Sequence, residues 1–128
     1  LRGERSFKTK ACLLVAERGS QIIGFARLNP ETRPWHISPA GNIGIALLAL
    51  YRHQGIGTNM LYLIVEQAAR FQYHCLTADI LAHNQASLGL FKKLGFVYHS
   101  HRQRNLDFLP GMVQEITVER VMAGGNSA

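Results

Sequence analysis

The residues whose type and spacing most clearly suggest a binding site are Gly55 and Gly57, which flank Ile56 shortly after Arg52. An apolar run ends just before them and a segment with apolar residues at helical spacing follows, so a strand gives way to a helix here. The first N–H groups of a helix have no partner inside it, and the helix dipole is positive at that end, so phosphate is attracted. Glycine lets a ligand approach the main chain without a Cβ in the way. The pattern predicts a pyrophosphate-binding turn.

Two familiar nucleotide loops do not fit this turn. A dinucleotide fingerprint needs a third glycine where Met60 stands, and a Walker A loop needs a lysine between Gly57 and Thr58. What remains is Arg-x-x-Gly-x-Gly, formed by Arg52, Gly55 and Gly57. Two glycines before a helix are also common where a chain simply passes from one element to the next. On the spacing alone, a turn that binds no ligand therefore remains an alternative.

A second segment runs from Asn84 to Phe96 and has the features of a short helix. Asn84 is a good N-cap residue, while Leu88, Phe91 and Leu94 share one face and Gly95 is a natural stop. Together the two segments resemble the coenzyme A pyrophosphate loop and the Asn-to-Leu-Gly-Phe helix of the GNAT (acetyl-CoA-dependent) N-acetyltransferase superfamily. The resemblance covers about residues 11–122, and the strand and helices that open such folds are missing from it.

The resemblance implies acetyl-CoA as co-substrate. Backbone N–H groups of the turn would hold the pyrophosphate, and the main chain at the end of the preceding strand would pair with the pantetheine arm. Asn84 could instead serve only as an N-cap, an alternative of equal weight. For Lys93, a position on a solvated helix face is a simpler explanation than contact with the nucleotide phosphates. The implied coenzyme-binding residues are Leu47, Leu48, Arg52, His53, Gln54, Gly55, Ile56, Gly57, Thr58, Asn84, Ser87, Phe91 and Lys93.

The implied reaction is direct transfer of an acetyl group to a primary amine within a ternary complex, which requires a base for the amine. The resemblance implies Asp79 as the candidate base, because some family members have an acid at this place, five residues before the Asn, and alternation places Asp79 on the face opposite Ala78. A structural acid bonded to a neighbour is the alternative. Family members often have Tyr where this chain has Phe91, and a phenyl ring donates no proton. Water, Ser87 or Tyr98 is then the candidate acid.

The elements that position these residues form an α/β (α+β) fold with a mixed, mostly antiparallel sheet and helices packed on it, in the order β-β-β-α-β-α-β-β. We expect one domain over residues 1–122, which begins with an irregular segment at residues 1–10, and a flexible tail at 123–128. The predicted strands are 11–17, 21–28, 42–50, 75–81, 96–104 and 114–122, and the predicted helices are 57–71 and 84–94.

The composition and the distribution of charge argue against several classes of binding partner. The chain has 128 residues and a formal net charge of +6, but its basic residues are scattered and form no stripe suited to nucleic acid. No apolar run has the length of a membrane span, and two cysteines fit reduced thiols in a cytoplasmic protein. His99 and His101 lack a third ligand at a convincing spacing, so no metal is expected. An open sheet edge would allow a homodimer.

Two other functions remain open at this stage. Phe91 and the missing front elements are compatible with a non-catalytic module that binds acyl-CoA, and the basic charge with a small nucleic-acid binder. The sequence does not identify the acceptor, which could be a small-molecule or a peptide amine.

Overall fold

The computed structural model describes residues 2–34, 39–105 and 112–122. They build one seven-stranded sheet with the order β1-β2-β3-β4-β5-β7-β6. The strands are β1 (Arg2–Ser6), β2 (Ala11–Arg18), β3 (Gln21–Pro30), β4 (Ala40–Leu47), β5 (Cys75–Leu81), β6 (Val97–Asn105) and β7 (Met112–Val121). The helices are α1 (Ile56–Arg70), α2 (Gln85–Lys93) and a short 3-10 turn, η1 (Ala49–Tyr51).

The sheet is mostly antiparallel, and the β4–β5 pair is parallel. α1 is the crossover between these two strands, as a parallel connection requires. The predicted fold class is therefore confirmed.

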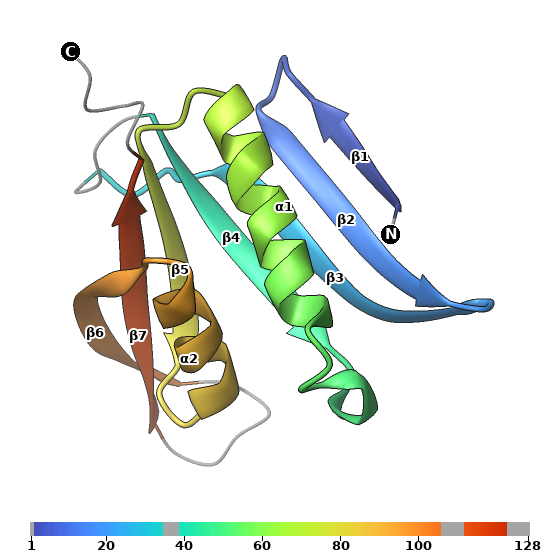
Figure 1. Cartoon of the computed structure of the whole chain (residues 1–128). Coiled ribbons are helices and arrows are strands. Elements are labelled where there is room, and N and C mark those ends of the chain that lie inside the picture. The colour runs from blue at the N-terminus through green and yellow to red at the C-terminus, as the bar shows by residue number, and fades with distance from the viewer. Residues whose placement is uncertain (1, 35–38, 106–111, 123–128) are drawn as a thin grey trace.

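Both α-helices lie on the same face of the sheet (Figure 1). α1 packs on β2, β3 and β4, and its apolar residues at helical spacing, Leu61, Ile64, Val65 and Ala68, are buried. Alternate strand residues supply the other side of the core, for example Leu28, Ile43 and Leu76. The side chains between these positions point to the opposite face, which no helix covers among the described residues.

Local sequence explains how α2 begins and ends. Asn84 is its N-cap residue, and the side-chain oxygen of Asn84 accepts a hydrogen bond from the Ser87 N–H at 3.1 Å. Gly95 follows the helix with a φ of 92°, a left-handed conformation that glycine adopts without strain. The predicted cap and stop are both confirmed.

Two predictions about the strands are wrong. Residues 2–6 are not an irregular lead-in but form β1, which pairs with β2, so the predicted order omits one strand. Charged residues such as Glu4 and Arg5 hid this strand, because an edge strand tolerates charge. The strand predicted for 42–50 ends at Leu47, and Ala49–Tyr51 form η1 instead. The tail at 123–128 lies outside the described residues.

Candidate functional site

β4 and β5 separate in the middle of the sheet. They pair only from Ala40 to Asn42 on one strand and from Cys75 to Thr77 on the other, although both strands continue beyond these positions. The two strands diverge visibly toward the lower edge of Figure 1. The gap leaves backbone groups on the facing edges of β4 and β5 without a partner strand, and such groups can pair with an extended ligand.

The backbone of β4 shows which groups face the gap. The N–H of Leu48 donates to the carbonyl oxygen of Ile23 at 2.8 Å, so it points toward β3. Successive residues of a strand alternate in direction, and the polar groups of Leu47 and Ile45 therefore point toward β5. Of the two residues predicted to pair with a pantetheine arm, Leu47 is placed to do so, whereas the Leu48 N–H is already bonded to Ile23.

The N-terminus of α1 opens at the same end of β4. The N-cap residue Gly55 has a φ of 82°, no side chain caps the helix, and its first turn contains no acid. The first N–H that bonds back along the helix is that of Asn59, at 3.0 Å from the carbonyl oxygen of Gly55. The amides from Ile56 to Thr58 are thus available to an anion.

Gly57 brings α1 close to α2. A Cβ built at Gly57 would lie 3.4 Å from Cδ2 of Leu90, so a methyl group fits there and a longer side chain would have to enter the space between the helices. The turn before it is shaped by His53, which has a φ of 64°, and by Gln54, whose side chain donates to the carbonyl oxygen of Leu50 at 3.3 Å.

A pocket of about 560 Å³ occupies the space between β4, α1 and α2, a volume suited to a cofactor-sized molecule. Arg52, His53 and Lys93 line it, and no carboxylate does, so the pocket suits a polyanion. Free amides, cations and small residues together fit the diphosphate and thiol arm of coenzyme A. The lining residues are Ile45, Ala46, Leu47, Arg52, His53, Gly55, Gly57, Thr58, Asn84, Ala86, Ser87, Gly89, Leu90 and Lys93.

Nine of the thirteen residues predicted to bind the coenzyme line this pocket, and Leu48, Gln54, Ile56 and Phe91 do not. Phe91 is 1% exposed and packs edge-to-face on Phe96 with ring centroids 5.0 Å apart, so its ring belongs to the core. Sequence reasoning missed Ile45 and Ala46 of β4, and it missed three residues of α2, Ala86, Gly89 and Leu90. Their spacing along α2 places them near Asn84 and Lys93, and this spacing could have identified them.

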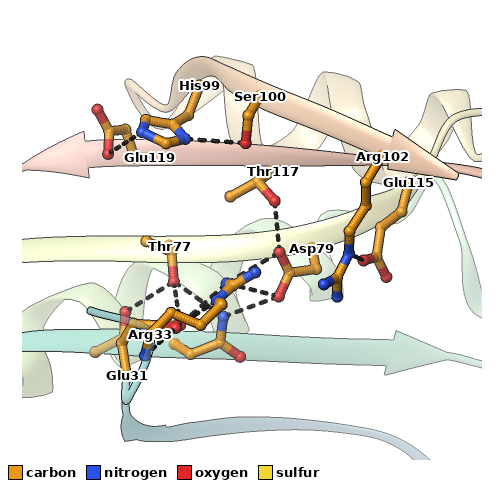
Figure 2. A network of polar contacts seen from close by, with 12 residues as sticks. Glu31, Arg33, Thr77, Asp79, His99, Ser100, Arg102, Glu115, Thr117 and Glu119 are labelled. Carbon is orange, nitrogen blue, oxygen red and sulfur yellow. Dashed lines mark hydrogen bonds and ion pairs between the residues drawn. The ribbon is translucent and has the colours of Figure 1, made fainter. Parts of the chain in front are cut away.

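A polar cluster lies on the opposite face of the sheet, with Asp79 of β5 at its centre (Figure 2). Arg33 donates to both carboxylate oxygens of Asp79 through Nη2, at 3.1 and 3.0 Å. Thr117 donates to Oδ1 at 2.7 Å, and Asn42 donates to Oδ2 at 3.3 Å. These four contacts match the four lone-pair positions of a carboxylate. Both carboxylate oxygens of Asp79 therefore already accept hydrogen bonds from neighbouring side chains.

Glu31 anchors the same cluster from the segment that follows β3. Its side chain is 4% exposed, is paired with Arg33 and accepts a hydrogen bond from the Thr77 hydroxyl at 2.9 Å. Burial opposes the charge on Glu31, but the hydrogen bonds and the charge of Arg33 outweigh it and lower the pKa to about 2. The Arg33 guanidinium, held between Glu31 and Asp79, has a raised pKa. Glu31 is therefore a permanent anion at neutral pH.

The pocket at this cluster has a volume of about 360 Å³. It is lined by Arg27, Asn29, Pro30, Glu31, Thr32, Arg33, Asn42, Asp79 and Arg102. Sequence reasoning singled out Asp79 alone from this set. The alternation of Thr77 with Asp79 and of Glu115 with Thr117 was a readable sign of a polar face, whereas the approach of Arg33 was not, because 46 residues separate it from Asp79.

Tyr98, the weak candidate for a catalytic acid, lies apart from both pockets. It is 58% exposed on the edge strand β6, and its hydroxyl is bonded to Nδ1 of His101. It pairs in register with Val118, a core residue, and so points to the face opposite Asp79. The structure does not bring Tyr98 to the other candidate residues.

Other site chemistries find little support among the described residues. They contain no group of three or more His, Cys, Asp or Glu arranged to hold a metal ion. Cys75 is buried, and burial with the nearby Glu119 raises the pKa of its thiol to about 11, which leaves it protonated and unreactive. In the part of the chain that the structure covers, no helix has the length and apolarity needed to span a membrane.

Known proteins resemble this chain in sequence and in structure. The model of the acetyltransferase (GNAT) family matches residues 2–96. A ribosomal-protein-alanine N-acetyltransferase from Brucella melitensis is 25% identical, with a TM-score of 0.77 over 90% of this chain and 71% of that one. An acetyltransferase of the GNAT family from Streptococcus pneumoniae is 21% identical, with a TM-score of 0.77 over 89% and 68%.

A GNAT superfamily phosphinothricin acetyltransferase from Sinorhizobium meliloti, solved with acetyl-CoA, reaches a TM-score of 0.80 at 18% identity, over 94% of this chain and 66% of that one. At this identity the likeness concerns the fold. Among curated proteins, no sequence gives a significant match.

Proposed function

Because the chain belongs to the acetyltransferase (GNAT) family, we propose that it transfers an acetyl group from acetyl-CoA to a primary amine by direct attack in a ternary complex. The family makes the protein an acyltransferase with acetyl-CoA as its co-substrate. The amine acceptor and the mechanism are the proposed part, as is the extent of the catalytic domain over residues 1–122.

On the helix-covered face, the coenzyme pocket holds the diphosphate and the thiol arm. Amides of the first turn of α1 bind the diphosphate, with Arg52 and Lys93 adding positive charge. The free edge of β4 at Ile45 and Leu47 pairs with the arm. Bound acetyl-CoA supplies an activated acetyl group and a thiolate leaving group.

The acceptor enters from the opposite face, where Asp79 borders the gap between β4 and β5. The nitrogen of the acceptor amine attacks the thioester carbonyl. A C–N bond forms, the C–S bond breaks, and the amine gives up a proton. We assign that proton to Asp79, which the amine reaches by displacing its longest contact, the one from Asn42 at 3.3 Å. Arg33 keeps the carboxylate in place meanwhile.

The leaving sulfur does not depend on a tyrosine. Phe91 has no hydroxyl and its ring is enclosed in the core. A thiolate is a stable enough leaving group near neutral pH to depart as the anion and then take a proton from water. Ser87 of α2 lines the coenzyme pocket and is the alternative proton donor.

The observation that carries the proposal is the placement of two pockets on opposite faces of the sheet beside one gap in it. β4 contributes to both, with Ile45 and Leu47 on the coenzyme side and Asn42 on the side of Asp79. A gap of this kind lets a thioester and an amine meet while each is held by a different set of residues, which is how positioning lowers the barrier.

Calorimetry with acetyl-CoA and a thiol-release assay over a panel of small-molecule and peptide amines test the proposal. We expect binding, and release of coenzyme A that depends on the amine. Gly57→Leu should lower acetyl-CoA affinity at least about tenfold, because the side chain enters the pocket, whereas Gly57→Ala should change it little. Binding without turnover on any amine, or release that ignores the amine, would contradict it.

A further inference from the structure

Arg27 differs from the other arginines of the pocket beside Asp79. Arg33 is paired with Glu31 and Asp79, and Arg102 is paired with Glu115 through a 2.9 Å contact. Arg27 makes only one side-chain hydrogen bond among the described residues, from Nη1 to Oδ1 of Asn42 at 3.4 Å. A guanidinium has five N–H donors, so most of the hydrogen-bonding capacity of Arg27 is directed at solvent.

The backbone of β4 leaves room for this guanidinium. Arg27 on β3 is paired in register with Gly44 on β4. A Cβ built at Gly44 would lie 2.7 Å from Cζ of Arg27 and 2.8 Å from its Nε and Nη2, which is closer than non-bonded atoms approach. The planar end of Arg27 therefore lies against the Gly44 backbone, and any side chain at position 44 would push it away.

Arg27 also stands beside the acceptor end of the gap. Asn42 accepts from Arg27 through Oδ1 and donates to Asp79 through Nδ2, so a single amide group separates the guanidinium from the carboxylate. Gly44 lies two residues beyond Asn42, in the part of β4 that no longer pairs with β5. A molecule whose amine reaches Asp79 passes within reach of Arg27.

Resting on the acetyl transfer proposed above, we infer that the acceptor carries a carboxylate on the same molecule as its amine, as a free amino acid does, and that Arg27 binds this carboxylate. A guanidinium matches a carboxylate with two parallel hydrogen bonds, which also fixes orientation. The carboxylates of the pocket, Glu31 and Asp79, are held by Arg33 and the neighbouring polar groups, so Arg27 is the cation left for a ligand. A polyamine would meet repulsion from it.

The experiment compares matched acceptors with the intact protein. Free L-amino acids, their carboxamides and a polyamine are assayed for amine-dependent coenzyme A release. The best amino acid should exceed its carboxamide about 10- to 100-fold in kcat/KM, the range expected for a charged hydrogen-bonded pair. Equal rates with the carboxamide, preference for the polyamine, or no acetylation of any amino acid would overturn the inference.

Substitutions at the guanidinium complete the test. Arg27→Gln should lower kcat/KM for the amino acid about 10- to 100-fold and lower it much less for the carboxamide, which lacks the carboxylate that Arg27 binds. Gly44→Ala keeps the positive charge of Arg27 but displaces its guanidinium, and should also lower kcat/KM for the amino acid. Arg18→Gln, an exposed arginine at the end of β2, is the control and should have no effect. An equal loss for both acceptors would contradict the role of Arg27.

Failure of this inference is distinguishable from failure of the proposed function. If the chain acetylates amines that lack a carboxylate, acetyl transfer holds and the role of Arg27 falls. If acetyl-CoA binds with no release of coenzyme A on any amine, both fall.

Discussion

A single nitrogen of Arg33, Nη2, lies 3.1 Å from Oδ1 and 3.0 Å from Oδ2 of Asp79. The contact ties the segment after β3 to the middle of β5 across the face that would receive the acceptor (Figure 2). Both side chains are mostly shielded, with 19% and 23% of their surface exposed, so water screens the pair only in part. The position of the candidate base therefore depends on a residue from a distant segment of the chain.

Asp79→Asn should lower kcat by about 100-fold or more, since it removes the group assigned to the proton while keeping the size of the side chain. Acetyl-CoA affinity should stay unchanged, because Asp79 does not line the coenzyme pocket. Steady-state kinetics and calorimetry measure the two. Should Asp79→Asn fold poorly, Thr117→Val removes only the 2.7 Å contact that helps to orient the carboxylate and should lower kcat to a smaller extent. A fully active Asp79→Asn enzyme would exclude the role.

Glu31 should make the fold sensitive to acid. Its folded pKa is lowered from 4.5 to about 2, so its contribution to stability is complete above about pH 4.5 and is lost as the pH falls toward 2. At about 1.4 kcal/mol per pKa unit, the contribution is at most about 3.5 kcal/mol. Urea unfolding at a series of pH values measures it. Glu31→Gln should flatten this part of the curve, whereas the exposed Glu66→Gln should not.

Lys92 and Lys93 form a matched pair on α2. Lys93 lines the coenzyme pocket and Lys92 does not. Lys93→Gln should weaken acetyl-CoA binding about 3- to 10-fold and reduce its dependence on salt, because one cation near the phosphates is lost. Lys92→Gln should leave both unchanged. Equal effects of the two substitutions would show that the lysines act through general charge.

Phe91→Tyr tests whether a tyrosine at this position would help. The ring is enclosed against Phe96, so the added hydroxyl would be buried in an apolar setting. We expect no gain in kcat and a loss of about 1 to 3 kcal/mol in the free energy of unfolding. Kinetics and chemical denaturation measure the two effects. A tenfold rise in kcat would instead place the hydroxyl in the coenzyme pocket.

Local physics explains the parts of the fold that the sequence predicted well. Asn84 and Gly95 act within one helical turn, so their types alone define the ends of α2. The helical spacing that puts Phe91 on one face with the partly buried Leu88 and Leu94 already indicated a core position for Phe91, against the coenzyme role implied by the family resemblance.

The end of β4 illustrates what sequence cannot decide. The apolar run continues to Leu50, yet Leu50 is 79% exposed and the strand stops at Leu47. Hydrophobicity does not distinguish a strand residue from a residue of a turn that borders a pocket. The polar cluster around Asp79 was also out of reach in large part, because it depends on which distant segments the sheet brings together, as with Arg33 and Asn42.

The short ladder between β4 and β5 has a mechanical consequence. Strands β1 to β4 form one half of the sheet and β5 to β7 the other, and the backbone pairing between them spans only Ala40–Asn42 and Cys75–Thr77. A molecule bound in the gap contacts both halves, so we expect its binding to slow hydrogen exchange of amides on both sides of the gap.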